Sequence, residues 1–226
     1  MERNRENGNN IYCKKTVQNE QTENWNMYKL HKIISRIKYK IVQSIVNQKF
    51  PCYYKCEEEN MDVKFQESKQ MVGTYKIVDI ANWFLHKGNG NMEQKKLQKL
   101  CYYAQAWGLV FTGNKICNCE FEAWVHGPVN RELWYDLKSY GYANIEESHF
   151  DSIAKPIANP VIKTILEDVW ATYGSFTGFE LEMLTHSEEP WIRARGNTPK
   201  DAPSNTHICE KIMRDFYASK LPEDNV

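Results

Sequence analysis

Residues 92–111 read MEQKKLQKLCYYAQAWGLVF, and they carry the clearest helical pattern in the chain. Its apolar side chains recur at the three- and four-residue spacing that places them on one face of an α-helix. Asn91, with Gln94 three residues later, predicts where the helix starts, and Gly113 predicts where it ends. The predicted core face consists of Leu97, Leu100, Cys101, Ala104, Trp107 and Phe111.

Further helices are predicted on both sides of this one. Apolar positions from Ile77 to Phe84 indicate a helix that stops at the sequence Gly88-Asn89-Gly90. Asn159-Pro160 predicts the start of another helix, which ends before Gly174. Thr177-x-x-Glu180 is a capping-box pattern that introduces a third helix, broken near Pro190. A last helix carries Ile208, Ile212 and Phe216.

One segment favours extended structure. Residues 116–125 (ICNCEFEAWV) are rich in β-favouring side chains, and Gly127-Pro128 indicates a turn after them. Because proline suits the first turn of a helix, we expect Pro128 to begin a helix that runs to Gly141. The sequence thus predicts a mainly α fold with a small extended element, formed by residues 73–226.

Length and composition exclude several classes of protein. The chain has 226 residues, of which 42% are hydrophobic and 26% charged, as in ordinary globular proteins. It lacks both the run of about 18–20 apolar residues that a membrane span needs and the apolar centre of a signal peptide. We therefore expect a cytoplasmic protein without a membrane span.

The formal net charge of zero averages two unlike parts. Residues 1–72 carry 13 Lys/Arg and 9 Asp/Glu, whereas residues 73–226 carry 16 and 20. Residues 1–72 are predicted to be partly disordered, with one basic amphipathic helix at about 27–46. Its basic face either is solvated or contacts an anionic partner, a membrane surface or a nucleic acid. That face carries Lys29, Lys32, Arg36 and Lys40.

The sequence does not predict catalysis. It contains no G-x-S-x-G elbow, no phosphate-binding glycine loop and no H-E-x-x-H zinc motif. The seven cysteines indicate reduced thiols, and neither Cys52-x3-Cys56 nor Cys117-x-Cys119 has the paired spacing of a zinc site. We expect no catalytic residues, no cofactor and no metal.

Aromatic residues make up 13% of the chain, including seven Trp and thirteen Tyr. Some of these side chains must fill the core, but Trp124 and Trp191 stand in or beside predicted turns. Amphipathic aromatic residues near polar turns are typical of surfaces that bind other proteins. For each of them, core packing and partner contact are both open readings.

Three stretches, taken in order, resemble the Panacea domain, the SocA-like antitoxin domain that also occurs in phage-associated proteins. They are KLQKLCYYAQAWG (96–108), EFEAWVHGPV (120–129) and LEMLTHSEEPWIRARG (181–196), preceded by a helix at about 75–85 and followed by one near 208–217. The resemblance covers about 74–218. It implies a compact multi-helix domain that acts as a non-enzymatic antitoxin.

The resemblance also implies partners. The expected function is that of an antitoxin in a type II-like toxin–antitoxin system, which neutralises a cognate toxin by direct binding. Alternatives are a proteolytic adaptor that delivers the toxin to a Clp-type protease, and a nucleic-acid-binding autoregulator acting through residues 27–46. Motif or partner-contact candidates are Tyr102, Tyr103, Trp124, His126, Gly127, Pro128, His186, Pro190 and Trp191.

Residues 1–70 lie outside the resemblance. One reading is that they adapt the common domain to its particular toxin. The other is that they are accessory, because the sequence from Met71 onward resembles the start of proteins that consist of a Panacea domain alone.

Overall fold

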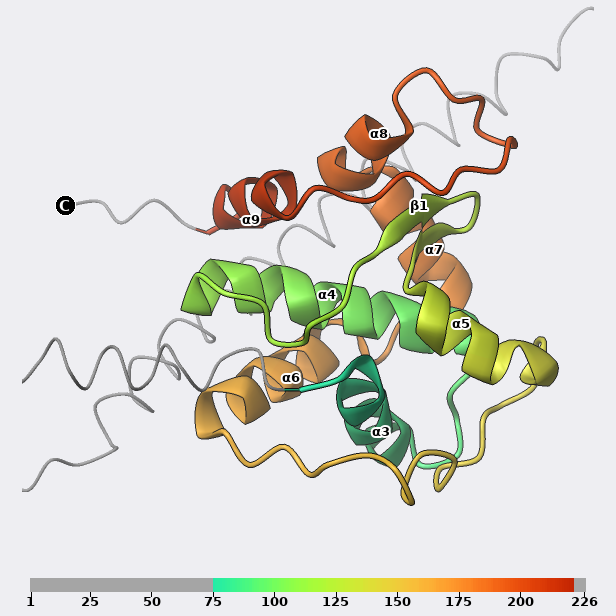
Figure 1. Cartoon of the computed structure of the whole chain (residues 1–226), viewed down its shortest axis with the longest axis vertical. Coiled ribbons are helices and arrows are strands. Elements are labelled where there is room, and N and C mark those ends of the chain that lie inside the picture. Colours follow the sequence, from blue (N-terminus) through green and yellow to red (C-terminus); the bar gives the residue numbers. More distant parts are fainter. Residues whose placement is uncertain (1–74, 222–226) are drawn as a thin grey trace, which may run out of the picture.

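The computed structural model describes residues 75–221 and confirms a mainly α fold. Within this range the chain forms seven α-helices and one short hairpin (Figure 1). The basic helix predicted at 27–46, with Lys29, Lys32, Arg36 and Lys40, lies outside the described residues and stays a prediction. The disorder predicted for part of residues 1–72 and the reading of Met71 as a start also fall outside the described residues and stay predictions.

Helix α4 (Gln94–Thr112) is the centre of the fold (Figure 1). It contacts α3 (Ile77–Gly88), α5 (Arg131–Leu137), α6 (Pro160–Tyr173), α7 (Gly178–His186) and α9 (Glu210–Ala218). Most of its residues are buried, including every predicted core position except the half-buried Phe111. Because neighbours surround α4, its polar residues are buried as well, and Gln98, Lys99 and Gln105 bond to backbone groups of the following loop and hairpin.

The predicted helix boundaries are confirmed where a cap is formed by a short side chain. Asn159 Oδ1 accepts hydrogen bonds from the Val161 and Ile162 amides at the start of α6, and Pro160 is its first residue. Thr177 and Glu180 form the expected capping box of α7. Helix α8 (Glu189–Arg195) follows after a short break and carries Pro190 in its first turn. The predicted end of α4 at Gly113 is also confirmed, with a left-handed φ of 70°.

The structure corrects the prediction around Pro128. Strands β1 (Glu122–Trp124) and β2 (Gly127–Val129) pair as an antiparallel hairpin, so Pro128 lies in a strand opposite Ala123. Helix α5 begins only at Arg131, because Asn130 Oδ1 accepts the Leu133 amide 2.9 Å away and so caps the helix. A short 3₁₀ turn, Lys138–Tyr140, extends α5 to Gly141.

Three smaller expectations differ from the structure. The cap of α4 is Glu93 and not Asn91. Only residues 122–124 of the predicted extended segment 116–125 form a strand. On α9 the fully buried residues are Met213 and Tyr217, one position beyond the predicted Ile212 and Phe216, which are half-buried.

The cysteines also differ from the expectation of reduced thiols. Cys117 and Cys119 form a disulfide, whereas Cys101 and Cys209 are free. Both bonded cysteines are buried in the segment that leads from α4 to the hairpin. In the described residues, no group of three or more His, Cys, Asp or Glu side chains could hold a metal ion. No helix in the same range is long and apolar enough to cross a membrane.

Candidate partner-binding surface

The hairpin β1–β2 brings together several residues that the sequence singled out. Its turn needs Gly127, whose φ of +91° is strained for any residue with a Cβ. A Cβ at this position would also lie 2.7 Å from Lys99 Cε and 2.8 Å from Thr185 Oγ1. Gly127 and Pro128 are both buried, so they position the turn and do not themselves offer side chains to a partner.

A buried amine lies directly beneath this turn. Lys99 is 1% exposed, and its Nζ donates a hydrogen bond to the Pro128 carbonyl oxygen at 3.0 Å. Burial lowers the pKa of Lys99 to about 7, with the Glu182 carboxylate opposing that effect. Lys99 therefore ties α4 to the hairpin mainly through a hydrogen bond, although it is not part of the predicted core face of the helix.

Glu182 of α7 holds the hairpin tip against α4. One carboxylate oxygen lies 2.9 Å from His126 Nδ1, and the other accepts a hydrogen bond from Lys95 Nζ at 2.6 Å. Burial opposes the ionisation of Glu182, but the hydrogen bonds from Lys95 and His126 outweigh it and keep the pKa of the carboxyl below its ordinary value. The side chain of His126 is itself 69% exposed, so it remains accessible at the tip of the turn.

The first strand is fixed by a second carboxylate. Glu122 accepts two hydrogen bonds from the Arg131 guanidinium, at 2.9 and 2.7 Å, and a third from Trp124 Nε1 at 2.7 Å. Burial opposes the ionisation of Glu122, yet the Arg131 and Trp124 donors leave its pKa below the ordinary value. The bidentate pairing with Arg131 fixes the Glu122 carboxylate, and the hydrogen bond from Nε1 to that carboxylate then orients the Trp124 indole. The indole remains only half-buried.

The motif of α7 and α8 supports the hairpin from the other side. Trp191 Nε1 donates a hydrogen bond to the Trp124 carbonyl oxygen at 2.9 Å, and the His186 ring stacks on Trp191 with centroids 4.0 Å apart. Arg195 lies 5.1 Å from the Trp191 ring and donates to the Ala123 carbonyl oxygen at 3.0 Å. Pro190, Trp191 and Arg195 are buried, which favours a structural role for this motif.

Tyr102 and Tyr103 are also core residues in the structure. Both are fully buried, and Tyr103 stacks on Tyr173 with ring centroids 3.9 Å apart. Tyr103 and Tyr217 donate hydrogen bonds to the same oxygen of Glu188, at 3.2 and 2.6 Å. Between the two roles that the sequence left open for Tyr102 and Tyr103, their burial favours packing.

Beside the hairpin lies a groove of about 310 Å³, which we call the Trp124 groove. The indole of Trp124 meets that of Trp134 with centroids 5.2 Å apart, and Tyr142 at one end is 89% exposed. Only Trp124 and His126 of this groove were candidates from the sequence, although the tyrosine next to Gly141 and the Trp134 of α5 carried a similar aromatic signal. The residues that define the groove are Lys95, Trp124, His126, Trp134, Lys138 and Tyr142.

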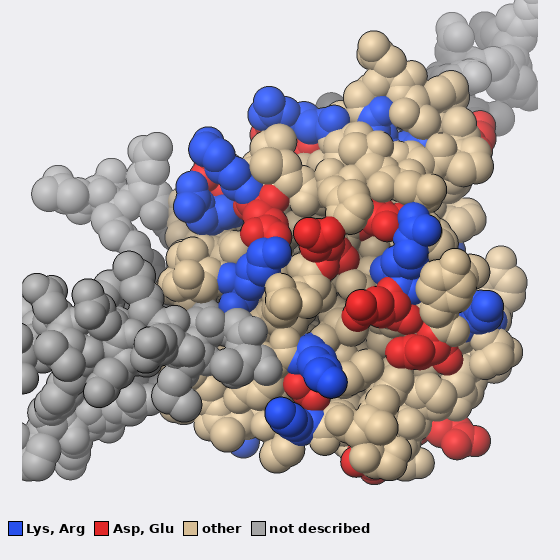
Figure 2. All heavy atoms as spheres, in the orientation of Figure 1, with Lys and Arg blue, Asp and Glu red and all other residues tan. Residues whose placement is uncertain are grey.

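The charges of the groove are unequally compensated. Lys95 pairs with Glu182, whereas Lys138 forms no ion pair with any described residue and lies 4.9 Å from the Tyr135 ring. On the face shown in Figure 2, basic and acidic side chains alternate without a large patch of either sign. The carboxylate of Glu93, which also lines the groove, accepts the Gly178 amide. The groove thus combines accessible aromatic surface with the unpaired ammonium of Lys138, a composition typical of protein-binding sites.

Part of the chain is similar to a family of antitoxin domains. Residues 97–192 match the family model described as antitoxin SocA-like, Panacea domain, and the resemblance read from the sequence is confirmed. Antitoxin SocA of Caulobacter vibrioides (strain NA1000 / CB15N) is 28% identical over 130 residues, which cover 54% of this chain and 69% of that protein. No solved structure matches the chain significantly. The matched residues include the hairpin and most of the Trp124 groove.

Proposed function

We propose that this chain is the antitoxin of a type II-like toxin–antitoxin system and neutralises its toxin by direct binding through the Trp124 groove. The observation that carries the proposal is the similarity of residues 97–192 to SocA-like antitoxins. The proposed role is non-enzymatic, and we expect the protein to act in the cytoplasm.

The groove supports this proposal through its accessible side chains. Trp124 and Trp134 are half-buried, so part of each indole is exposed, and nearly the whole Tyr142 side chain is accessible to a partner. Large aromatic side chains of this kind bury much area at a small entropic cost, and they dominate the energy of many interfaces. Lys138 and the exposed His126 at the rim favour a toxin segment that carries a carboxylate beside an apolar side chain.

Co-expression tests the proposal. The protein encoded by the neighbouring gene is produced alone and together with this chain, and growth and complex formation are measured. We expect the neighbour to be toxic alone and harmless in the complex. A neighbour that is harmless alone, or that stays toxic and unbound beside this chain, would contradict the antitoxin role.

Substitution tests the surface. Tyr142→Ala combined with Lys138→Glu should weaken toxin binding by about tenfold or more, since it removes an exposed anchor and reverses an uncompensated charge. Matched controls are Ile153→Ala, also an exposed hydrophobic residue, and Lys200→Glu, an exposed lysine away from the groove. Equal binding by the groove variant and both controls would place the interface elsewhere.

The same strains separate inhibition from proteolytic delivery. If the chain inhibits by binding, neutralisation persists when the Clp-type protease is deleted. An adaptor would lose neutralisation in that strain while still binding the toxin.

A further inference from the structure

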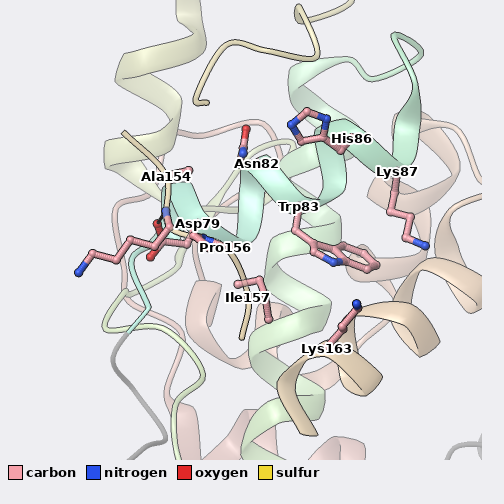
Figure 3. A pocket seen from close by; sticks show the side chains of 10 residues that line it. Asp79, Asn82, Trp83, His86, Lys87, Ala154, Pro156, Ile157 and Lys163 are labelled. Atoms are coloured by element: carbon pink, nitrogen blue, oxygen red, sulfur yellow. Dashed lines mark hydrogen bonds between the residues drawn. The ribbon is translucent and has the colours of Figure 1, made fainter. Parts of the chain in front are cut away.

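A second groove, of about 540 Å³, lies between α3, the chain segment before α6 and α6 itself. We call it the Trp83 groove, and the residues that define it are Asn82, Trp83, Lys87, Lys155, Ile157 and Lys163. In Figure 3 the Trp83 indole projects from α3 toward Lys163 of α6, with Ile157 beside it. The volume falls within the range of about 300–1,000 Å³ that small-molecule sites occupy.

The groove offers one flat aromatic surface. Trp83 is half-buried, and its ring is held by edge contact with the buried Phe84, with centroids 5.2 Å apart. Lys87 Nζ lies 5.1 Å from the Trp83 centroid and is tethered by an ion pair with Glu167 at 2.8 Å. Ile157 forms an apolar wall near the ring (Figure 3). A planar ring would find both a stacking face and an apolar edge here.

Two further lysines line the groove. Lys155 and Lys163 are exposed and form no ion pair with any described residue. The acids nearby are already engaged. Asp79 accepts the backbone amides of Lys76 and Lys155 at 2.8 and 2.7 Å, and Asp151 binds His86 at 2.7 Å. The groove is therefore set up to attract an anion, not to repel one.

We infer that the Trp83 groove binds a mononucleotide. The base stacks on Trp83 beside Ile157, and the phosphate pairs with Lys163, toward which the indole projects (Figure 3). Free phosphate would leave the aromatic face unused, and an uncharged ring would leave the two ammonium groups without a counter-charge. The inference goes beyond the antitoxin role and does not depend on it, because none of the groove's residues belongs to the Trp124 groove.

Titration of the full chain tests the inference. AMP, GMP, adenosine and inorganic phosphate are titrated separately, with binding measured by calorimetry and by the shift of the Trp83 indole N–H signal in NMR spectra. That signal is identified as the one missing from Trp83→Phe. We expect saturable binding of at least one nucleotide, clearly tighter than that of adenosine or phosphate, and weaker at high salt because exposed charges are screened.

Variants separate a built site from general charge. Lys163→Glu should weaken nucleotide binding by about tenfold, whereas Lys200→Glu, which makes the same change outside the groove, should leave it unchanged. Both lysines are exposed, so neither change threatens the fold. Lys163→Arg should restore most of the affinity.

Three outcomes would overturn the inference. They are adenosine binding as tightly as AMP, equal losses from Lys163→Glu and Lys200→Glu, and saturation only with a single-stranded oligonucleotide. The last outcome would assign the groove to a nucleic-acid strand and not to a free nucleotide. Loss of nucleotide binding would leave toxin neutralisation intact, so this test and the test of the antitoxin role can fail separately.

Discussion

At the scale of single residues, the hairpin turn depends on one missing Cβ. Gly127→Ala forces a side chain into a left-handed conformation and places its Cβ against Lys99 and Thr185. We expect a loss of about 2–4 kcal/mol in the free energy of unfolding, from the backbone strain and the overpacking together. Urea denaturation measures it.

Gly90→Ala is the matched control for that change. Gly90 has a φ of +76°, but a Cβ there would meet nothing within 4 Å. This variant should lose only the backbone part, about 1 kcal/mol. If the two variants are equally stable, the close approach of Gly127 to Lys99 contributes nothing.

Glu188 makes stability depend on pH. It accepts hydrogen bonds from Tyr103 and Tyr217 in the core, and burial raises its pKa from 4.5 to about 8 against the opposing effect of those bonds. The folded chain therefore binds this proton more tightly than the unfolded chain does. Its contribution to stability is fully present below about pH 4.5 and declines as the pH rises to about 8.

Glu188→Gln should remove that decline. The amide is neutral at every pH, so we expect the variant to match the parent near pH 5 and to exceed it by about 1 kcal/mol or more at pH 8. Thermal unfolding across this pH range measures the difference. Glu189→Gln, at the exposed neighbouring position, should keep the decline of the parent, and a Glu188→Gln variant with an unchanged pH profile would contradict the assignment.

Single-residue roles were the hardest to predict from the sequence. Trp124 and His126 were selected because aromatic and polar side chains flank a turn, and the structure leaves both accessible. Tyr102 and Tyr103 were candidates because they stand beside the core positions of the helical motif 96–108, yet α4 is buried on all sides, which helical periodicity alone does not reveal. Lys99 could not be predicted as a buried residue, because its partner is a backbone carbonyl 29 positions away.

At the scale of elements, the capping signals can be tested directly. Asn159→Ala removes the acceptor for two amides at the start of α6, and we expect it to cost about 0.5–2 kcal/mol of stability. The change is read as a shift of the urea midpoint. Asn205→Ala, in an exposed loop, should shift it by much less, and equal effects would mean that the cap does not stabilise α6.

Local signals predicted the elements well where the cap was local. Asn159-Pro160 and Thr177-x-x-Glu180 fixed the starts of α6 and α7 because the side chain bonds only to its own first turn. Pro128 misled the prediction because its place depends on a distant pairing. Strand β1 is flanked by residues 206–208, whose backbone bonds to Ala123 and Phe121, and no local pattern indicates that contact.

At the scale of the whole molecule, the zero net charge is the sum of two regions with opposite excess. Residues 1–72 carry four more basic than acidic residues, and residues 73–226 carry four more acidic than basic ones. The described residues enclose one continuous core centred on α4. The toxin-binding surface that we propose lies wholly within this part.

This division predicts the result of a truncation. A chain of residues 73–226 should unfold with a free energy within about 1 kcal/mol of the full chain, because the core that stabilises it is retained. It should still neutralise the toxin, since the Trp124 groove is intact. Any affinity of the full chain for DNA or RNA should fall steeply with salt and vanish on truncation, because the basic segment is gone. A truncated chain that folds but no longer binds the toxin would instead make residues 1–72 part of the interface, with Lys29, Lys32, Arg36 and Lys40 as the first positions to reverse in charge.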